Sequence, residues 1–245
     1  MTHISRFDVI RLLALGMPPL IVPAASWAEQ RPAIAEQLAK TYGLDAFGQI
    51  EGVRYTFNAE LPGVQLSRKW EWNPKIDTVS YEGKDKEGKP VKATYQRSLL
   101  GNQSDAVKNE IEPAFTNDQY WLLFPFHLVW DSSATVTDEG THKLPLGDAA
   151  AERVVVKYPS EGGYSAGDTW ELYVGPDKRV TEFIFRRGGA AKPSIVIATW
   201  ADNKKAGPLL ISTDHRGTAD GKSLRVSLTD VSVKLTGSEN WISAQ

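Results

Sequence analysis

Apolar and polar residues alternate along most of this chain, and that pattern restricts its fold more than any other feature. Val53, Tyr55, Phe57 and Ala59 are separated by single polar residues, a period of two that is typical of a half-buried antiparallel strand. The same rhythm predicts further strands at residues 64–72, 76–81, 91–97, 134–138, 152–158, 169–174, 179–186, 195–202, 208–213 and 224–235. We therefore expect a mainly β protein.

The turns between these segments predict how the strands connect. Gly175–Lys178 is a strong hairpin signal, and a second turn lies around Asp220-Gly221. Short strands at near-regular spacing, with no linker, low-complexity run or internal repeat, favour a single antiparallel sheet. We expect this sheet to be strongly curved, as an incomplete or half β-barrel, and residues 29–245 to form a single domain.

Two segments have a helical pattern instead. Ile34, Leu38 and Tyr42 recur every four residues within 31–43, which predicts an N-terminal helix. The strand rhythm also stops between residues 102 and 131.

In this central segment, a helix capped by Ser104 or Asp105 is expected to end at Pro113, because proline lacks the N–H that a helix interior uses. The strongly aromatic stretch that follows is expected to form a helix or turn, with an extended segment after Pro125. We interpret the whole segment as a helical lid over the open side of the sheet.

Residues 1–28 have the organisation of a cleavable signal peptide. Arg6 and Arg11 precede an apolar stretch, and Ser26-Trp27-Ala28 places small residues at −3 and −1 of the cleavage site. The apolar stretch is too short to span a bilayer. We expect cleavage after Ala28 and a periplasmic protein, with secretion as the alternative, and no transmembrane span in the mature chain.

The composition narrows the classes of function. After cleavage the chain would carry 26 Lys and Arg against 29 Asp and Glu, a balance that gives no basic footprint for nucleic acid or anionic lipid heads. There is no cysteine, which excludes disulfides, thiol catalysis, thiolate zinc and acylation at a cleavage-site cysteine. No cofactor is indicated.

Sequence motifs for catalysis are weak. His127, His142 and His215 lack the spacing of a helical metal pair. Ser212, Asp214 and His215 contain the residue types of a catalytic triad, but the chain has no Gly-x-Ser-x-Gly elbow.

A carboxylate-based hydrolase is the enzymatic alternative. Glu71 and Glu171 adjoin tryptophans, as in sites that stack and cleave sugars. Strand alternation places both carboxylates on the face opposite those tryptophans, towards water. We therefore expect a protein that is not an enzyme.

The aromatic content suggests a binding role. The mature chain would hold seven tryptophans, at positions 70, 72, 121, 130, 170, 200 and 241. Large rigid side chains can fill a core, or they can line a concave sheet and leave a cavity for an acyl chain.

The order of these features resembles the LolA/LolB-like periplasmic lipoprotein-carrier superfamily and its uncharacterised exported relatives. The segments that carry the resemblance are Asn117–Phe126, Thr199–Asp202 with Gly207-Pro208-Leu209, and Asp220-Gly221-Lys222. It implies a half-barrel with a helical lid and a hydrophobic cavity for lipid or acyl chains. The carriers hold their lid closed with an arginine; Arg54 and Arg68 lie on strands here, and the sequence assigns that role to neither.

We therefore expect an exported binding protein for lipid or another apolar ligand, without enzymatic activity. The residues expected to form the wall and cover of the cavity are Trp70, Trp72, Tyr120, Trp121, Phe124, Phe126 and Trp130. The main alternative is a structural or interaction module whose concave face receives an envelope protein partner.

Overall fold

Antiparallel strands form one large sheet in the computed structural model, which describes residues 31–188 and 194–245. The segment interpreted as a signal peptide lies outside these residues. The strands are β1 Ile50–Leu61, β2 Val64–Asn73, β3 Thr78–Lys84, β4 Pro90–Gln96, β5 Thr135–Lys143, β6 Ala150–Lys157, β7 Thr169–Val174, β8 Val180–Arg187, β9 Ser194–Thr199, β10 Ala201–Ala206, β11 Leu209–Ala219, β12 Lys222–Leu235 and β13 Trp241–Ser243. Each segment predicted as a strand overlaps a strand of the sheet. The segment predicted at 195–202 is divided at Trp200 between β9 and β10, β11 extends six residues beyond its predicted end, and β13 was not predicted.

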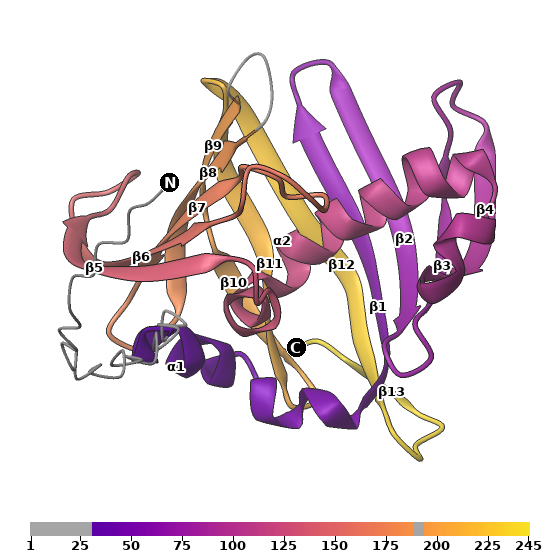
Figure 1. Ribbon diagram of the computed structural model, residues 1–245, viewed down its shortest axis with the longest axis horizontal. Coiled ribbons are helices and arrows are strands. Elements are labelled where there is room, and N and C mark those ends of the chain that lie inside the picture. Colours follow the sequence, from indigo (N-terminus) through magenta and orange to yellow (C-terminus); the bar gives the residue numbers. More distant parts are fainter. Residues whose placement is uncertain (1–30, 189–193) are drawn as a thin grey trace, which may run out of the picture. The chain divides into compact units, whose positions relative to one another are not determined.

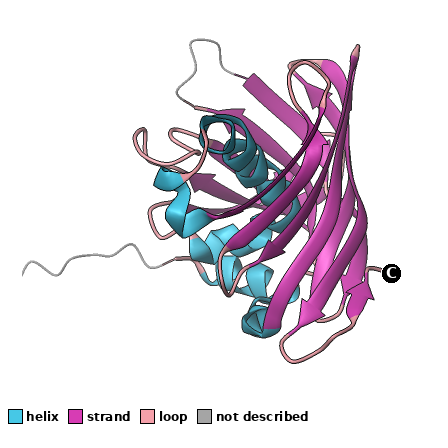
Figure 2. Ribbon diagram, turned by 90° about the vertical axis from the view of Figure 1, so that its right-hand side faces the viewer, coloured by secondary structure: helices cyan, strands magenta, loops and turns pink. Residues whose placement is uncertain are grey.

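The sheet is open. Its strands follow the order β4-β3-β2-β1-β12-β11-β9-β8-β7-β6-β5, with β10 beside β11 and β13 beside β12 (Figure 1). In the described part of the chain, the outer strands β4 and β5 do not pair with each other. Figure 2 shows the sheet curving around the helices, which all lie on its concave side. The predicted mainly β, strongly curved, incomplete barrel is confirmed.

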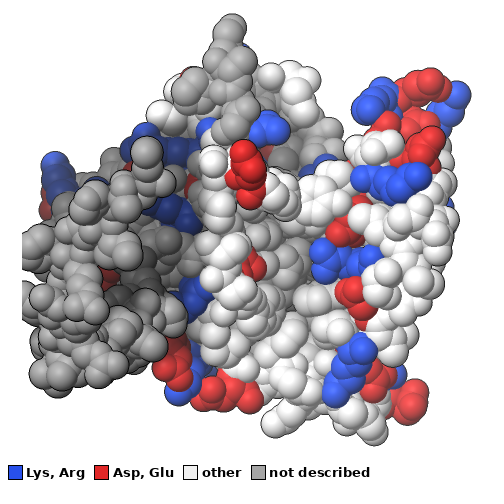
Figure 3. Space-filling view, viewed as in Figure 1, with Lys and Arg blue, Asp and Glu red and all other residues white. Residues whose placement is uncertain are grey.

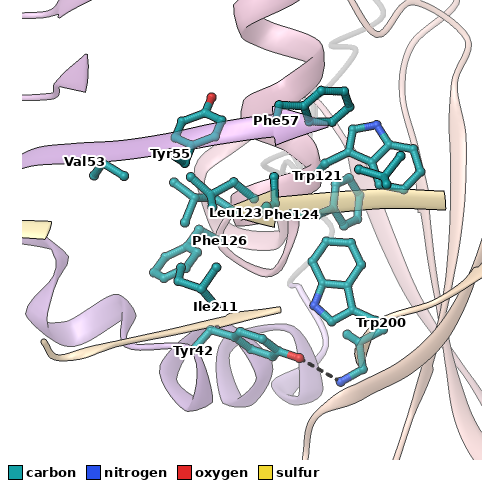
Figure 4. Packing of buried hydrophobic residues seen from close by; sticks show 14 of the residues in the cluster. Tyr42, Val53, Tyr55, Phe57, Trp121, Leu123, Phe124, Phe126, Trp200 and Ile211 are labelled. Atoms are coloured by element: carbon teal, nitrogen blue, oxygen red, sulfur yellow. Dashed lines mark hydrogen bonds between the residues drawn. The ribbon is translucent and has the colours of Figure 1, made fainter. Parts of the chain in front are cut away.

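The helices are α1 Ala33–Thr41, η1 Leu44–Gln49, η2 Arg97–Asn102, η3 Val107–Ile111 and α2 Glu112–Trp130. The predicted N-terminal helix is therefore confirmed as α1. The apolar face of α1 is buried at Ala35 and Leu38. Tyr42 follows the helix, and its hydroxyl accepts a hydrogen bond from the Val180 amide at 3.2 Å (Figure 4). No helix in the described segments is long and apolar enough to cross a membrane.

The central helix differs from the expectation at both of its prolines. A turn of π-helix at η3 leads directly into α2, and Pro113 lies in the first turn of α2, where a missing N–H costs little. Pro125 lies inside α2, and the helix continues past it with a kink at Leu123, whose φ and ψ are −127° and 20°. The break at Pro113 and the extended segment after Pro125 are therefore wrong.

The concave face is filled by α2 and its aromatic side chains. Phe124 and Phe126 are fully buried, and Phe124 stacks on Trp170 of β7 with ring centroids 4.0 Å apart. Phe57 of β1 packs against Trp121 at 6.5 Å. Figure 4 shows Phe57, Trp121, Phe124 and Phe126 meeting between α2 and the strands. Burial of this face holds α2 against the sheet.

The pairing of β9 with β11 requires a glycine at position 217. A Cβ there would lie 1.9 Å from the Ile197 carbonyl oxygen and 2.7 Å from the Ala198 Cα, both backbone atoms of β9. Gly217→Ala should therefore lower the free energy of unfolding by about 1–3 kcal/mol, measured by urea denaturation. Gly48→Ala is the control, because its Cβ would meet no atom within 4 Å; equal stability of the two variants would contradict this prediction.

Candidate functional site

Helix α2 is fixed to the sheet by a buried ion pair near its middle. The Asp118 side chain is fully buried and accepts hydrogen bonds from Arg68 Nε at 2.7 Å and Arg68 Nη2 at 2.5 Å. It also accepts one from the Trp70 indole at 2.8 Å. Burial raises the pKa of Asp118, and the contacts with Arg68 oppose that rise. Of the two strand arginines, Arg68 is thus the one that contacts α2.

The start of α2 is held in a similar way. Glu112 is 2% exposed and accepts hydrogen bonds from the Tyr95 hydroxyl at 2.6 Å and from Arg97 Nε at 2.9 Å. Burial raises the pKa of Tyr95 well above its usual value, and the Glu112 carboxylate adds to the rise. Tyr95 lies on β4 and Arg97 opens η2, so the sheet edge is tied to the helix.

A polar cluster lies at the C-terminal end of α2. Asp131 Oδ2 accepts hydrogen bonds from the hydroxyls of Tyr120 at 2.7 Å and Tyr158 at 2.6 Å. The Nδ1 atom of His127 lies 3.0 Å from both Asp131 oxygens, and its Nε2 lies 2.9 Å from Gln119 Oε1. The ring of Tyr120 also stacks on His127 at 3.9 Å.

These contacts set the charge of the cluster. Burial alone would raise the pKa of Asp131, but the hydrogen bonds from His127, Tyr158 and Tyr120 outweigh it and bring the pKa below its usual value. Burial raises the pKa of Tyr120 to about 12. Burial also raises the pKa of Tyr158 well above its usual value, and the neighbouring Tyr120 and Asp131 add to the rise. At neutral pH Asp131 is therefore a carboxylate that accepts hydrogen bonds from two neutral phenols.

Two adjoining cavities open beside α2. The first, which we call the terminal hollow, has a volume of about 600 Å³ and lies around the Asp131 cluster. The second, the flank groove, has a volume of about 410 Å³ and lies between α2 and strands β7 to β9. Thr116, Tyr120, Tyr164 and Ser165 line both cavities, so one ligand could occupy the two together. Their volumes are those of ordinary ligand sites.

Both cavities have walls of mixed chemistry. Trp121, Trp170, Phe185 and Val196 make one stretch of the flank groove apolar, while Asp168 and Arg187 also line it. In the terminal hollow, serines, tyrosines and the Asp131 cluster line the wall together with Trp72 and Trp130. The pair can therefore receive a ligand with an apolar part and a polar part.

Buried donors without partners belong to residues that line these cavities. In the described residues, the indole N–H of Trp72 and the hydroxyl of Thr116 have no hydrogen-bond partner, and both residues line the terminal hollow. The indole N–H of Trp170 also has no partner among the described residues, and Trp170 lines the flank groove. All three donor atoms are buried, so their cost in free energy belongs to the core rather than to a ligand site.

The residues expected from the sequence to form the cavity wall divide into two groups. Trp72, Tyr120 and Trp130 line the terminal hollow, and Trp121 lines the flank groove. The others, Trp70, Phe124 and Phe126, are buried in the core without lining either cavity, and the Trp70 indole is bonded to Asp118.

Several site residues were not identified from the sequence. Asp131, Tyr158 and Tyr164 belong to the terminal hollow, and His127 was interpreted only as an ordinary histidine. The spacing of His127 and Asp131, one helical turn apart, was the available signal. Tyr158 and Tyr164 gave none, because the loop after β6 has no regular pattern.

The catalytic alternatives do not assemble. His215 is fully buried, and its Nδ1 faces the Thr199 carbonyl oxygen at 3.2 Å. Asp214 instead pairs with Arg216 and Arg225, on the other face of β11, so Ser212, Asp214 and His215 form no triad.

The two tryptophan-flanked carboxylates are also separated. Glu71 on β2 pairs with Arg54, and Glu171 on β7 pairs with Arg186 at 2.9 Å. The strands are six steps apart in the sheet order, about 30 Å along the sheet, which is beyond the separation of paired glycosidase carboxylates. Among the described residues, no group of three or more His, Asp or Glu side chains is placed to hold a metal ion.

The surface around the helix carries no large field of one sign in the part that is described. Figure 3 shows acidic and basic side chains interspersed on the face that Figure 1 presents. Exposed pairs such as Lys86 with Glu110 account for part of this pattern.

No family model matches the sequence, and no curated protein matches it. Among solved structures, the chain is similar to a DUF1329 family protein from Desulfovibrio piger, with a TM-score of 0.46 and 7% identity over 84% of this chain and 92% of that one. It is also similar to the lipoprotein LppX of Mycobacterium tuberculosis, with a TM-score of 0.29 and 9% identity over 80% of this chain and 95% of the other. The function proposed below rests on the sequence and the geometry of this chain.

Proposed function

We propose that the protein is an exported, non-enzymatic binding protein for lipid or another amphipathic ligand, related to the LolA/LolB-like carriers. The apolar part of the ligand would lie in the flank groove and the polar part in the terminal hollow. The proposal is supported chiefly by the apolar stretch of the flank groove, which shares four lining residues with the terminal hollow beside α2.

The energetics favour such a ligand. Each methylene buried in the groove would contribute about 0.8 kcal/mol, against the cost of association. Phe185 is half-buried in the groove wall, so a ligand that covers it gains apolar contact without unfolding the core. A periplasmic location follows from the interpretation of residues 1–28 as a signal peptide.

Mass spectrometry of an organic extract from natively purified protein tests this function. We expect a stoichiometric lipid with the wild type. Phe185→Glu should remove most of this lipid, because a carboxylate would then line the part of the flank groove proposed to hold its apolar chain.

Val91→Glu is the matched control. Val91 is also half-buried, but it lines a different cleft, on the other flank of α2 beside β4, so lipid occupancy should be retained. A stable wild-type protein that yields no lipid would contradict the proposed function, as would equal loss in both variants.

A further inference from the structure

We propose that the terminal hollow binds an organic ammonium group, such as the cationic head of an amphipathic ligand. The geometry that points to it is the meeting of five aromatic side chains with the Asp131 carboxylate at the C-terminal end of α2. The inference rests on the proposed function only for the apolar part of the ligand.

The charges around the hollow favour a cation. Asp131 and Glu161 both line it. Among the described residues of its lining, Arg97 is the one Lys or Arg, and its guanidinium is already bonded to the buried Glu112 at 2.9 Å. A phosphate, sulfate or carboxylate head would therefore meet a carboxylate without a free Lys or Arg, and the one other basic side chain described there, His127, is bonded to Asp131 itself.

The other cationic groups near the hollow do not fully cover the carboxylate of Asp131. Arg31 at the same end of α2 bonds the backbone carbonyl oxygens of Leu128 and Asp131. His127 approaches Asp131 from within the helix, and the Asp131 side chain keeps 20% of its surface exposed. The C-terminus of a helix adds a partial negative charge to the same place.

The directions of the hydrogen bonds give a second reason. The hydroxyls of Tyr120 and Tyr158 both donate to the same oxygen of Asp131. Each hydroxyl has a single proton, so towards a ligand these two groups present only lone pairs. An alkylated ammonium group has no acceptor atom that would need a donor from the protein. Its positive charge is stabilised by the lone pairs of these hydroxyls.

The aromatic walls give the third reason. Trp72, Tyr120, Trp130, Tyr158 and Tyr164 line the hollow together. Faces of such rings attract quaternary ammonium groups, and several rings around one site form an aromatic cage. Tyr164 is 52% exposed and stands at the mouth of the hollow, where a bound ligand would cover it.

Isothermal titration with choline and with its neutral isostere 3,3-dimethylbutan-1-ol tests the inference. The two probes have nearly the same shape and differ in charge. We expect choline to bind at least about tenfold more tightly, as cation–π and carboxylate contacts together predict. Equal affinities, or no binding of either probe, would overturn the inference.

Two variants locate the site. Tyr164→Ala should weaken choline binding about fivefold, and because Tyr164 is exposed the fold should persist. Asp131→Asn should weaken it about tenfold or more. Val64→Ala, which removes another exposed apolar side chain at the opposite end of β2 from Trp72, should leave the affinity unchanged. Choline affinity that none of these changes alters would also overturn the inference.

A chain-bearing probe separates this inference from the proposed function. Decyltrimethylammonium below its micelle concentration should bind more tightly than choline, and Phe185→Glu should abolish that gain. If decan-1-ol binds as tightly as decyltrimethylammonium, the ammonium site is wrong and the apolar groove remains. If choline binds but the decyl chain adds nothing, the ammonium site holds and the proposed function fails.

Discussion

Replacing Arg68 by alanine should lower the free energy of unfolding by about 3–5 kcal/mol, because it leaves a buried carboxylate without its cation. The Asp118 side chain is fully buried, and two of its hydrogen bonds come from Arg68. The remaining donors, Asn117 and the Trp70 indole, carry no charge. Urea denaturation followed by tryptophan fluorescence measures this loss.

A second ion pair that also involves a residue of β2 provides the control. Arg54 of β1 and Glu71 of β2 are in register and bonded at 2.8 Å, but their side chains are 45% and 48% exposed. Arg54→Ala should therefore cost less than about 1 kcal/mol. If the two alanine variants are equally stable, water reaches Asp118 and the pair does not fix α2.

The double variant Arg68→Met with Asp118→Leu separates the pair from the packing around it. Apolar replacements of similar volume often restore the stability that one missing partner removes. We expect the double variant to recover most of the unfolding free energy that Arg68→Ala loses. A deficit of about 1 kcal/mol should remain, because the Trp70 indole N–H loses its acceptor. A double variant as unstable as Arg68→Ala would show that the side-chain shapes matter more than the charges.

The sheet could be predicted because its signal is local. In β1 and β2, Tyr55 lies opposite Trp70 and Phe57 opposite Arg68, so the parity read from each strand alone assigned these residues to one face. The turn at Asp220-Gly221 was equally clear, since both residues adopt positive φ there. Each of these features depends on a few consecutive residues.

The central helix could not be predicted in full, because tertiary packing overrides its local signals. Pro125 is a helix breaker by propensity, yet both its neighbours Phe124 and Phe126 are fully buried between the sheet and the other helices. The kink at Leu123 accommodates the proline. Burial of aromatic surface on both sides of the proline thus outweighs one lost hydrogen bond.

Only part of the candidate site could be predicted from the sequence, for a related reason. Aromatic enrichment identified the segment that contains Tyr120 and Trp121, but not which rings would face a cavity. That distinction depends on where α2 lies against β7 to β9. The partners Arg68 and Asp118 are 50 residues apart, and the break in the apolar series at Arg68 was the one local sign that its face needed a charge.

Acidification should destabilise the protein through one buried histidine. Burial lowers the pKa of His215 from 6.5 to about 4, and the contact with the Thr199 carbonyl and the negative charge of Asp214 oppose this only in part. The unfolded chain therefore binds a proton at a higher pH than the folded chain. The stability that His215 contributes is complete above about pH 6.5 and is lost as the pH falls towards 4, by about 3 kcal/mol in total.

The side chains around His215 explain why it stays neutral. Its ring packs on Trp200 at 4.5 Å and on Trp121 at 5.4 Å, and its Nε2 has no hydrogen-bond partner. An imidazolium there would place a charge among indole rings without a counterion, since Asp214 points to the other face of β11 and pairs with Arg216 and Arg225.

Comparison of the wild type with His215→Leu isolates this contribution. Leucine cannot titrate, while His127, His142 and all carboxylates remain in both proteins. Unfolding free energies measured from pH 8 to pH 4 should fall by about 3 kcal/mol more in the wild type than in the variant. Parallel curves would mean that His215 is protonated at its ordinary pKa in the folded state. The aromatic core beneath α2 would then have to admit water, and the helix would be less firmly seated than its burial indicates.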